Sequence, residues 1–141
     1  MTNYFSAVYQ SAAWGSVELF NKKFLDLVSS MYYKDRKMNI TNKYDFEEGE
    51  HIITIAFKND LESTDEMLKN CDNLKRVFFT KFKTKYIRNM SSMFLWCISL
   101  TSINLTMFYT KNVIDMSHLF ECCSILKKKF ICLLEIISWK N

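Results

Sequence analysis

The stretch MLKNCDNLKRVFFTKFKTKYIRNMSS (residues 67–92) is followed at once by MFLWCISLTSINLTMFYTKNVIDMSH (residues 93–118), and the two align without a gap. A third copy begins with LFECCSIL (residues 119–126) and then stops matching. A fixed period of roughly 20 to 50 residues is typical of repeat proteins, in which each unit buries its apolar side against its neighbours. The period of 26 residues therefore favours a binding or structural role over catalysis.

Each copy begins with the spacing of an amphipathic helix. Around the start of the second copy, the apolar residues at i, i+3, i+4 and i+7 are Met90, Met93, Phe94 and Cys97. The residues that favour a helix N-cap at the same place in successive copies are Ser63, Asn89 and Asp115. Farther along, Ile103 and Leu105 have the alternate spacing of a strand. The sequence therefore predicts an α/β repeat, a solenoid built from helix–turn–strand units.

Outside the repeats, the chain divides into two further parts. Residues 1–49 lack the period, and an apolar helical spacing after Ser16 predicts an amphipathic helix over residues 16–31, as an N-terminal helical cap or module. Residues 50–126 hold about three units, of which the first is degenerate and starts with a predicted strand, HIITIAF (residues 51–57). The tail KKKFICLLEIISWKN (residues 127–141) is basic and apolar and out of register. We interpret this tail as the product of a frameshift, an unremoved intron or a gene fragment.

The pattern M-F-x-x-C-x-x-L-x-x-I-x-L-x-x-F-x-T-x-x-V-x-x-M-S, read from Met93, resembles the BspA-like leucine-rich repeat of bacterial and protist surface proteins, including mycoplasma-type surface lipoproteins. The resemblance implies a short leucine-rich-repeat-like solenoid with a parallel sheet on one face. It also implies adhesion and protein binding at the cell surface, with no enzyme activity, cofactor or metal. Two alternatives remain open: an intracellular protein-interaction scaffold, favoured by the lack of a visible secretory signal or anchor, and a truncated gene product without independent function.

On this interpretation, the repeat has a buried side and an outward strand face. The residues expected to form the structural core are Leu68, Cys71, Leu74, Met90, Phe94, Cys97, Leu100, Ile103, Leu105, Phe108, Met116, Phe120, Cys123 and Leu126. The residues expected to face outward and to contact a protein partner are Phe78, Thr80, Ser102, Asn104 and Thr106. Because the third unit lacks a recognisable strand, we also expect the C-terminal end of the array to favour self-association.

Other ligand classes are disfavoured by composition and spacing. The net charge of +4 does not by itself indicate a nucleic-acid partner, and the aromatic and basic residues of FFTKFKTKYIR (residues 78–88) are better explained as repeat core and solvated lysines. The residues His118, Cys122, Cys123 and Cys132 match no paired zinc-ligand spacing. Structural thiols are the favoured interpretation of the repeated cysteines, ahead of disulfides or metal ligands. The longest apolar run, residues 130–137, is too short to span a membrane.

Overall fold

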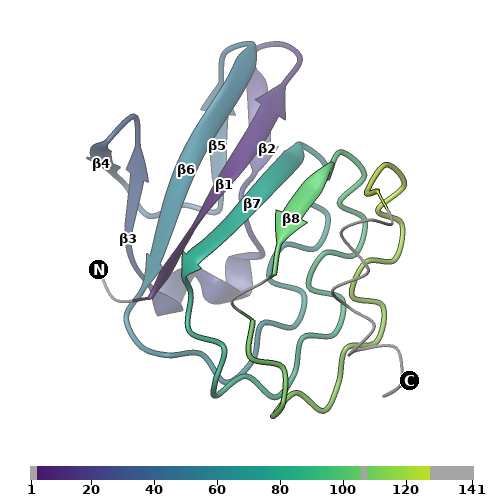
Figure 1. The fold of residues 1–141 in the computed structure, drawn as a ribbon. Helices are drawn as coiled ribbons and strands as arrows, with labels where there is room; N and C mark the ends of the chain where they lie inside the picture. The colour runs from purple at the N-terminus through teal and green to yellow at the C-terminus, as the bar shows by residue number, and fades with distance from the viewer. Residues whose placement is uncertain (1–2, 106–107, 128–141) are drawn as a thin grey trace.

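A computed structural model describes residues 3–105 and 108–127 of the chain. Its main feature is a six-stranded sheet with the order β4-β3-β6-β1-β7-β8 (Figure 1). The strands of this sheet are β1 (Tyr4–Ser11), β3 (Val28–Tyr33), β4 (Arg36–Met38), β6 (Gly49–Phe57), β7 (Leu74–Lys81) and β8 (Ser102–Asn104). Neighbouring strands are antiparallel except β7 and β8, which are parallel.

A smaller sheet pairs β2 (Gly15–Glu18) with β5 (Lys43–Phe46). It lies behind the large sheet in Figure 1, together with the 3-10 helix η1 (Lys22–Leu27). These elements cover one face of β1 and β6, because Phe5, Tyr9 and Ile53 on that face share a buried cluster with Val17 and Phe46. The other face of the large sheet has no described element in front of it in Figure 1.

The amphipathic helix predicted for residues 16–31 is wrong, and so is the helical character assigned to residues 1–49. This segment forms β2, η1 and the start of β3 instead. The buried residues belong to different elements: Val17 lies in β2, Phe24 in η1, and Val28 at the first position of β3. Three short elements that bury residues against the same core thus reproduce the spacing of one helix, an ambiguity expected for short apolar runs.

The helices predicted at the start of each repeat are also wrong, because each predicted helix contains two residues in the left-handed region. In the first full unit, φ is +58° at Glu66 and +62° at Asn70. The equivalent residues of the next two units, Ser92, Trp96, His118 and Cys122, have φ between +55° and +63°. Such values cannot occur within an α-helix. Each sits at the third position of a tight turn, as in a type II turn.

The residues predicted to cap helices instead stabilise turns. The Ser63 Oγ accepts a hydrogen bond from the Asp65 amide at 3.2 Å. The Asn89 and Asp115 side chains accept equivalent bonds from the amides two residues ahead, at 2.8 and 2.9 Å. This i to i+2 bond belongs to Asx and Ser/Thr turns, which favour the same residue types as helix N-caps. The sequence pattern therefore fits both structures.

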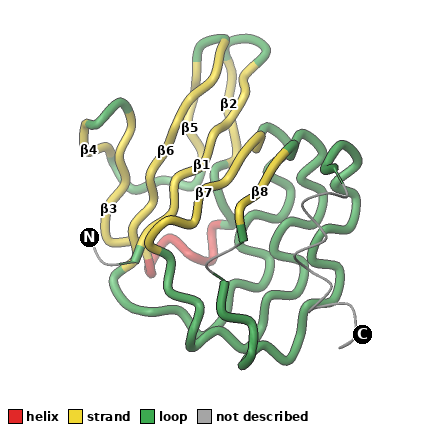
Figure 2. The backbone as a smooth tube through the Cα atoms, in the orientation of Figure 1, coloured by secondary structure: helices red, strands yellow, loops and turns green. Residues whose placement is uncertain are grey.

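The 26-residue period corresponds to a parallel stack of these turns. The amide of Leu68 donates to the carbonyl of Met93 at 2.9 Å, and the amide of Phe94 donates to that of Leu119 at 3.1 Å. The paired strand residues are separated by the same period, since Val77 of β7 pairs with Ile103 of β8. Figure 2 shows this region as loops beside the sheet, with η1 as the helix drawn for the described residues. The described part of the chain is therefore nearly all β, and the expected α/β helix–turn–strand solenoid is wrong.

Candidate functional site

The face of the large sheet that is turned away from β2, β5 and η1 is the candidate site, and we call it the outer face. Side chains alternate across a strand, so the buried Phe5, Ala7 and Tyr9 place the side chains of Ser6 and Gln10 on this face. The outer face carries Ser6, Val8, Gln10, Glu50, Ile52, Thr54, Arg76, Phe78, Thr80, Ser102 and Asn104. It is the face seen in front in Figure 1.

Four of the five residues predicted to face outward lie in the described part of the chain. Phe78 is 42% exposed and pairs across strands with Ser6 on one side and Asn104 on the other. Thr80 and Asn104 are exposed, and Ser102 is half-buried. Thr106 lies outside the described residues. The structure thus brings Phe78, Asn104 and Ser102 together on β7 and β8.

The outer face also includes an apolar residue that the repeat pattern did not indicate. Ile52 of β6 is 58% exposed, and its cross-strand neighbour Val8 is buried although it belongs to the same face. Ser6 and Thr54 share a hydrogen bond of 2.8 Å beside them. The alternation in HIITIAF could have shown that Ile52 faces away from Ile53 and Ile55. Its partner strand β1 lies outside the repeats, so the repeat pattern does not indicate that the two strands pair.

An ion-paired end borders the outer face. Glu50 of β6 contacts the ammonium of Lys75 and lies 2.9 Å from a guanidinium nitrogen of Arg76. The hydrogen bond from Lys75 and the charge of Arg76 lower the pKa of Glu50. These charges are paired with one another, and Arg76 lies opposite Val8, so the apolar residues Ile52, Val8 and Phe78 are bordered by an ion-paired cation.

The residues predicted as repeat core are placed as follows. Those that are buried are Leu68, Cys71, Leu74, Met90, Phe94, Cys97, Leu100, Ile103, Leu105, Met116 and Leu126. Those that are partly buried against the same cluster are Phe108, Phe120 and Cys123. The rings of Phe94 and Phe120, one period apart, stack at 5.2 Å.

The repeated cysteines are free thiols that stack along the array. The Cys97 Sγ donates to the carbonyl of Leu68 at 3.0 Å, and the Cys123 Sγ donates to that of Phe94 at 3.1 Å. Burial raises the pKa of Cys71 and Cys97 strongly, and raises the pKa of Cys123 to about 11. Thiols that stay protonated are poor nucleophiles and poor metal ligands. Among the described residues, no group of three or more His, Cys, Asp or Glu side chains could hold a metal ion.

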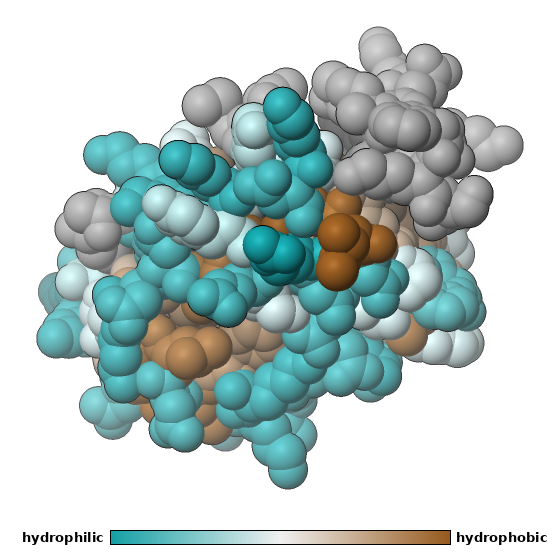
Figure 3. Space-filling model, turned by 90° about the horizontal axis from the view of Figure 1, so that it is seen from below, coloured by the Kyte–Doolittle hydropathy of each residue, from teal (hydrophilic) through white to brown (hydrophobic). Residues whose placement is uncertain are grey.

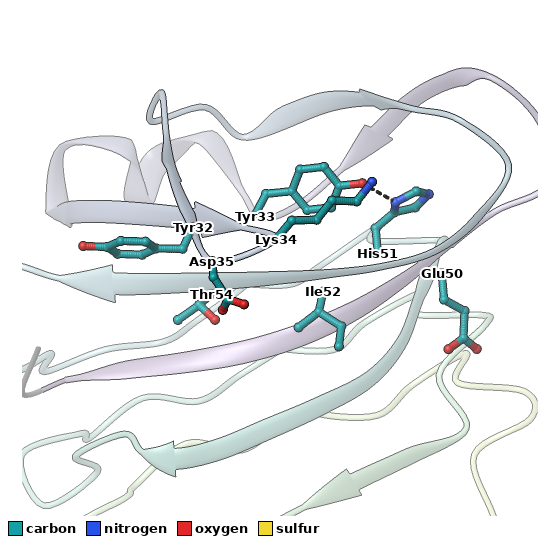
Figure 4. A pocket seen from close by; sticks show the side chains of 8 residues that line it. All are labelled: Tyr32, Tyr33, Lys34, Asp35, Glu50, His51, Ile52 and Thr54. Carbon is teal, nitrogen blue, oxygen red and sulfur yellow. Dashed lines mark hydrogen bonds between the residues drawn. The ribbon is translucent and has the colours of Figure 1, made fainter.

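A cavity of about 310 Å³ opens beside His51, between β6 and the β3–β4 hairpin (Figure 4). The His51 Nε2 lies 2.9 Å from the carbonyl of Glu47, so it carries the proton, and Nδ1 then accepts from the Tyr33 hydroxyl at 2.8 Å. The imidazole also stacks on Phe46 at 4.3 Å. His51 and Ile52 point to opposite sides of β6 in Figure 4. Both ring nitrogens of the buried histidine are therefore used within the fold, which is a structural arrangement.

In a comparison with known protein families, the family described as "Mycoplasma protein of unknown function, DUF285" matches residues 53–133, more than half of the chain. The chain belongs to the DUF285 family. The match begins inside β6 and takes in β7, β8 and all the stacked turns, so β1 to β5 of this DUF285 protein lie before it. No curated protein matches the chain, and no solved structure matches it.

The DUF285 assignment agrees with the expected resemblance only at the coarse level of a mycoplasma-type repeat protein. It does not support the finer assignment to BspA-like leucine-rich repeats. Among the described residues of this DUF285 protein, no helix is long and apolar enough to cross a membrane.

Proposed function

We propose that this DUF285 protein is a non-catalytic binding module that recognises a partner protein through its outer face. The observation that carries this proposal is the exposure of Ile52 and Phe78 on a sheet face that no described element covers. The two side chains come from the strands on either side of β1, where Ile52 lies opposite Val8 and Phe78 lies opposite Ser6. They therefore stand roughly 12 Å apart on a diagonal across β1. An adhesion role at the cell surface is the biological setting that the sequence resemblance favours.

The composition of the outer face suits a protein partner. Exposed apolar groups surrounded by polar ones are typical of interaction sites, and aromatic residues are enriched there. Ser102, Thr80 and Asn104 supply polar groups beside Phe78, whereas the ion-paired Glu50 keeps charge at one end. The partner surface that fits is therefore apolar at its centre and able to form hydrogen bonds at its rim.

Two features support a non-catalytic role. Both nitrogens of His51 are engaged in hydrogen bonds that fix its ring. The pKa values of Cys71 and Cys97 are raised by burial, so these thiols do not ionise near neutral pH. His51, Cys71 and Cys97, which are residue types that often act as bases or nucleophiles, thus serve the fold.

The test places a photo-crosslinking amino acid at Phe78 in the full chain. Irradiation in extracts of the source cell and of its host is expected to give a discrete adduct with a second protein. Trp14 is the matched control, because it is 74% exposed and lies in the loop after β1, away from the face. A probe there should give no such adduct. Equal adducts at both positions, or an adduct only with a second copy of the chain, would overturn the proposal.

The contribution of the polar rim is tested by truncation. Replacing Ser102 and Asn104 by alanine should weaken capture of the crosslinked partner while leaving the melting temperature close to that of the wild type. Unchanged capture would remove β8 from the binding face. A matched double substitution at Ser117 and Ser124, two exposed residues of the third unit, provides the control for nonspecific effects of alanine.

A further inference from the structure

A second surface lies at the opposite edge of the large sheet, along β4. A cavity of about 530 Å³ is formed there by Tyr33, Lys34, Arg36, Lys37, Met38 and Tyr44. Three of the six side chains are cationic, two are tyrosines, and none is a carboxylate. The volume lies within the range of ligand-binding pockets, which are mostly apolar with a few polar groups.

The cavity runs along the edge of the strand. Arg36, Lys37 and Met38 are consecutive, so their side chains point to alternate faces of β4, yet all three line the same cavity. Only an opening that wraps around the strand edge meets both faces. Within the described residues, β4 is the first strand of the sheet and pairs only with β3. An antiparallel edge strand has backbone N–H and C=O groups that point away from the sheet at alternate residues.

Two of the three cations at this edge have no ion-pair partner in the described part of the chain. Arg36 and Lys37 are exposed and form no ion pair with any residue in the described ranges. The third cation, Lys34, lies 3.7 Å from Glu47, and both side chains are about two-thirds exposed. Such a surface pair contributes little to stability and is easily exchanged for another carboxylate. Elsewhere, Lys43 and Arg76 are matched with Glu18 and Glu50.

Aromatic rings form the wall beside these cations. The Tyr33 and Tyr44 rings lie 5.9 Å apart, and Tyr44 contacts Phe46 at 4.8 Å, which joins the wall to the core. The Lys34 ammonium lies 5.0 Å from the centre of the Tyr33 ring. The wall is therefore held rigidly and can receive an aromatic or aliphatic side chain.

We propose that the β4 edge binds an extended acidic segment of a partner protein. The segment adds a strand to β4, its carboxylates pair with Arg36 and Lys37, and one apolar side chain enters the cavity and packs against the wall formed by Tyr33 and Tyr44. Strand addition of this kind obtains affinity from main-chain hydrogen bonds and specificity from pockets. Basic residues on an edge strand also prevent unwanted sheet pairing, but that role requires neither a cavity nor an aromatic wall. The inference rests on the proposed protein-binding function and assigns it a second site at the β4 edge of the sheet, apart from Ile52 and Phe78.

The test measures binding of a short fluorescein-labelled peptide of glutamates and tyrosines to the full chain by fluorescence anisotropy. The double substitution Arg36→Glu and Lys37→Glu should weaken binding by about tenfold. The control Lys85→Glu and Lys111→Glu makes the same change of net charge on exposed residues of the repeat loops, and should change binding by less than about twofold. The same peptide with glutamine in place of glutamate should bind weakly. The acidic peptide should also slow amide exchange at Lys37, which strand addition requires.

Three results would overturn the inference. Equal loss of binding in both double variants would show bulk electrostatics rather than a site. Unchanged amide exchange at Lys37 in the complex would exclude strand addition. The edge would be a site for nucleic acid if a single-stranded oligonucleotide bound as tightly as the peptide and the same two substitutions abolished its binding. None of these results changes the expected crosslink at Phe78, so failure here is distinguishable from failure of the proposed function.

Discussion

Substitution of Asn70 distinguishes the stacked turns from helices, because alanine and glycine at this position change the free energy of unfolding in opposite order in the two structures. Asn70 has φ of +62°, its side chain is exposed, and its backbone is fixed at both ends. Its amide donates to the carbonyl of Leu95, and its carbonyl accepts from the amide of Asp72, both at 2.9 Å. A left-handed conformation costs an ordinary L-residue about 1–2 kcal/mol, and asparagine pays less than this. Asn70→Ala should therefore lower the free energy of unfolding by about 1 kcal/mol.

Glycine at the same position should behave differently. Asn70→Gly removes the strain, and the gain is offset by the greater entropy of glycine in the unfolded chain, about 0.5–1 kcal/mol. The net effect should lie within about 0.5 kcal/mol of zero. In a helix the order is reversed, because alanine is the most favourable residue there and glycine costs about 1 kcal/mol more.

The assay is equilibrium unfolding in urea. With a slope of about 2 kcal/mol per molar, Asn70→Ala should lower the midpoint by roughly 0.5 M, and Asn70→Gly should leave it nearly unchanged. Asp72→Ala is the matched control, since Asp72 is an exposed neighbour outside the left-handed region. Its midpoint should move by less than about 0.25 M. A higher midpoint for Asn70→Ala together with a lower one for Asn70→Gly would refute the turn geometry.

Four further predictions follow from the described contacts. Asp35→Ala should lower the free energy of unfolding by about 1 kcal/mol, because φ is +60° at Asp35 in the two-residue hairpin and aspartate tolerates this conformation better than alanine; a higher free energy of unfolding would contradict that turn. Phe5→Ala should cost about 3–5 kcal/mol by urea unfolding, because the ring is fully buried among other phenylalanines; a loss below about 1 kcal/mol would be incompatible with this packing. The lowered pKa of Glu50 means that its stabilising contribution is complete above the ordinary glutamate pKa of about 4.3 and is lost as pH falls through the lowered folded value. The stability difference between wild type and Glu50→Gln should therefore shrink on acidification. A difference that grows on acidification would contradict the lowered pKa of Glu50. Peptide mapping after thiol alkylation should find Cys71 and Cys97 modified only in denaturant; rapid modification of the native chain would contradict their burial.

The repeat period was visible in the sequence, but the local structure inside it was not. Met67, Leu68 and Cys71 are buried, so the inward face follows from the apolar spacing. The turn conformation depends on positive φ at Glu66 and Asn70, and the sequence places glutamate, serine, tryptophan, histidine and cysteine at such positions where glycine would identify a turn. Helix and turn thus place the same residues inward, and only the backbone conformation separates them.

The candidate site was partly predictable for a similar reason. Phe78 and Asn104 lie on strands one period apart, so alternation within the repeat indicates their exposed face. Ile52 and Ser6 lie on that face because β1 pairs with both β6 and β7, at sequence separations that the repeat does not encode. Long-range antiparallel pairing depends on the packing of the whole chain, and a local pattern cannot specify it.

The most direct test of the fold is the backbone nuclear magnetic resonance spectrum of the repeat region. The stacked turns predict through-space contacts between the amide of Leu68 and backbone protons next to the carbonyl of Met93, and between the amide of Phe94 and those next to Leu119. They also predict coupling constants and intraresidue contacts diagnostic of positive φ at Ser92 and Trp96. An unbroken series of close amide–amide contacts over residues 90–97, with negative φ throughout, would instead show a helix and contradict the account.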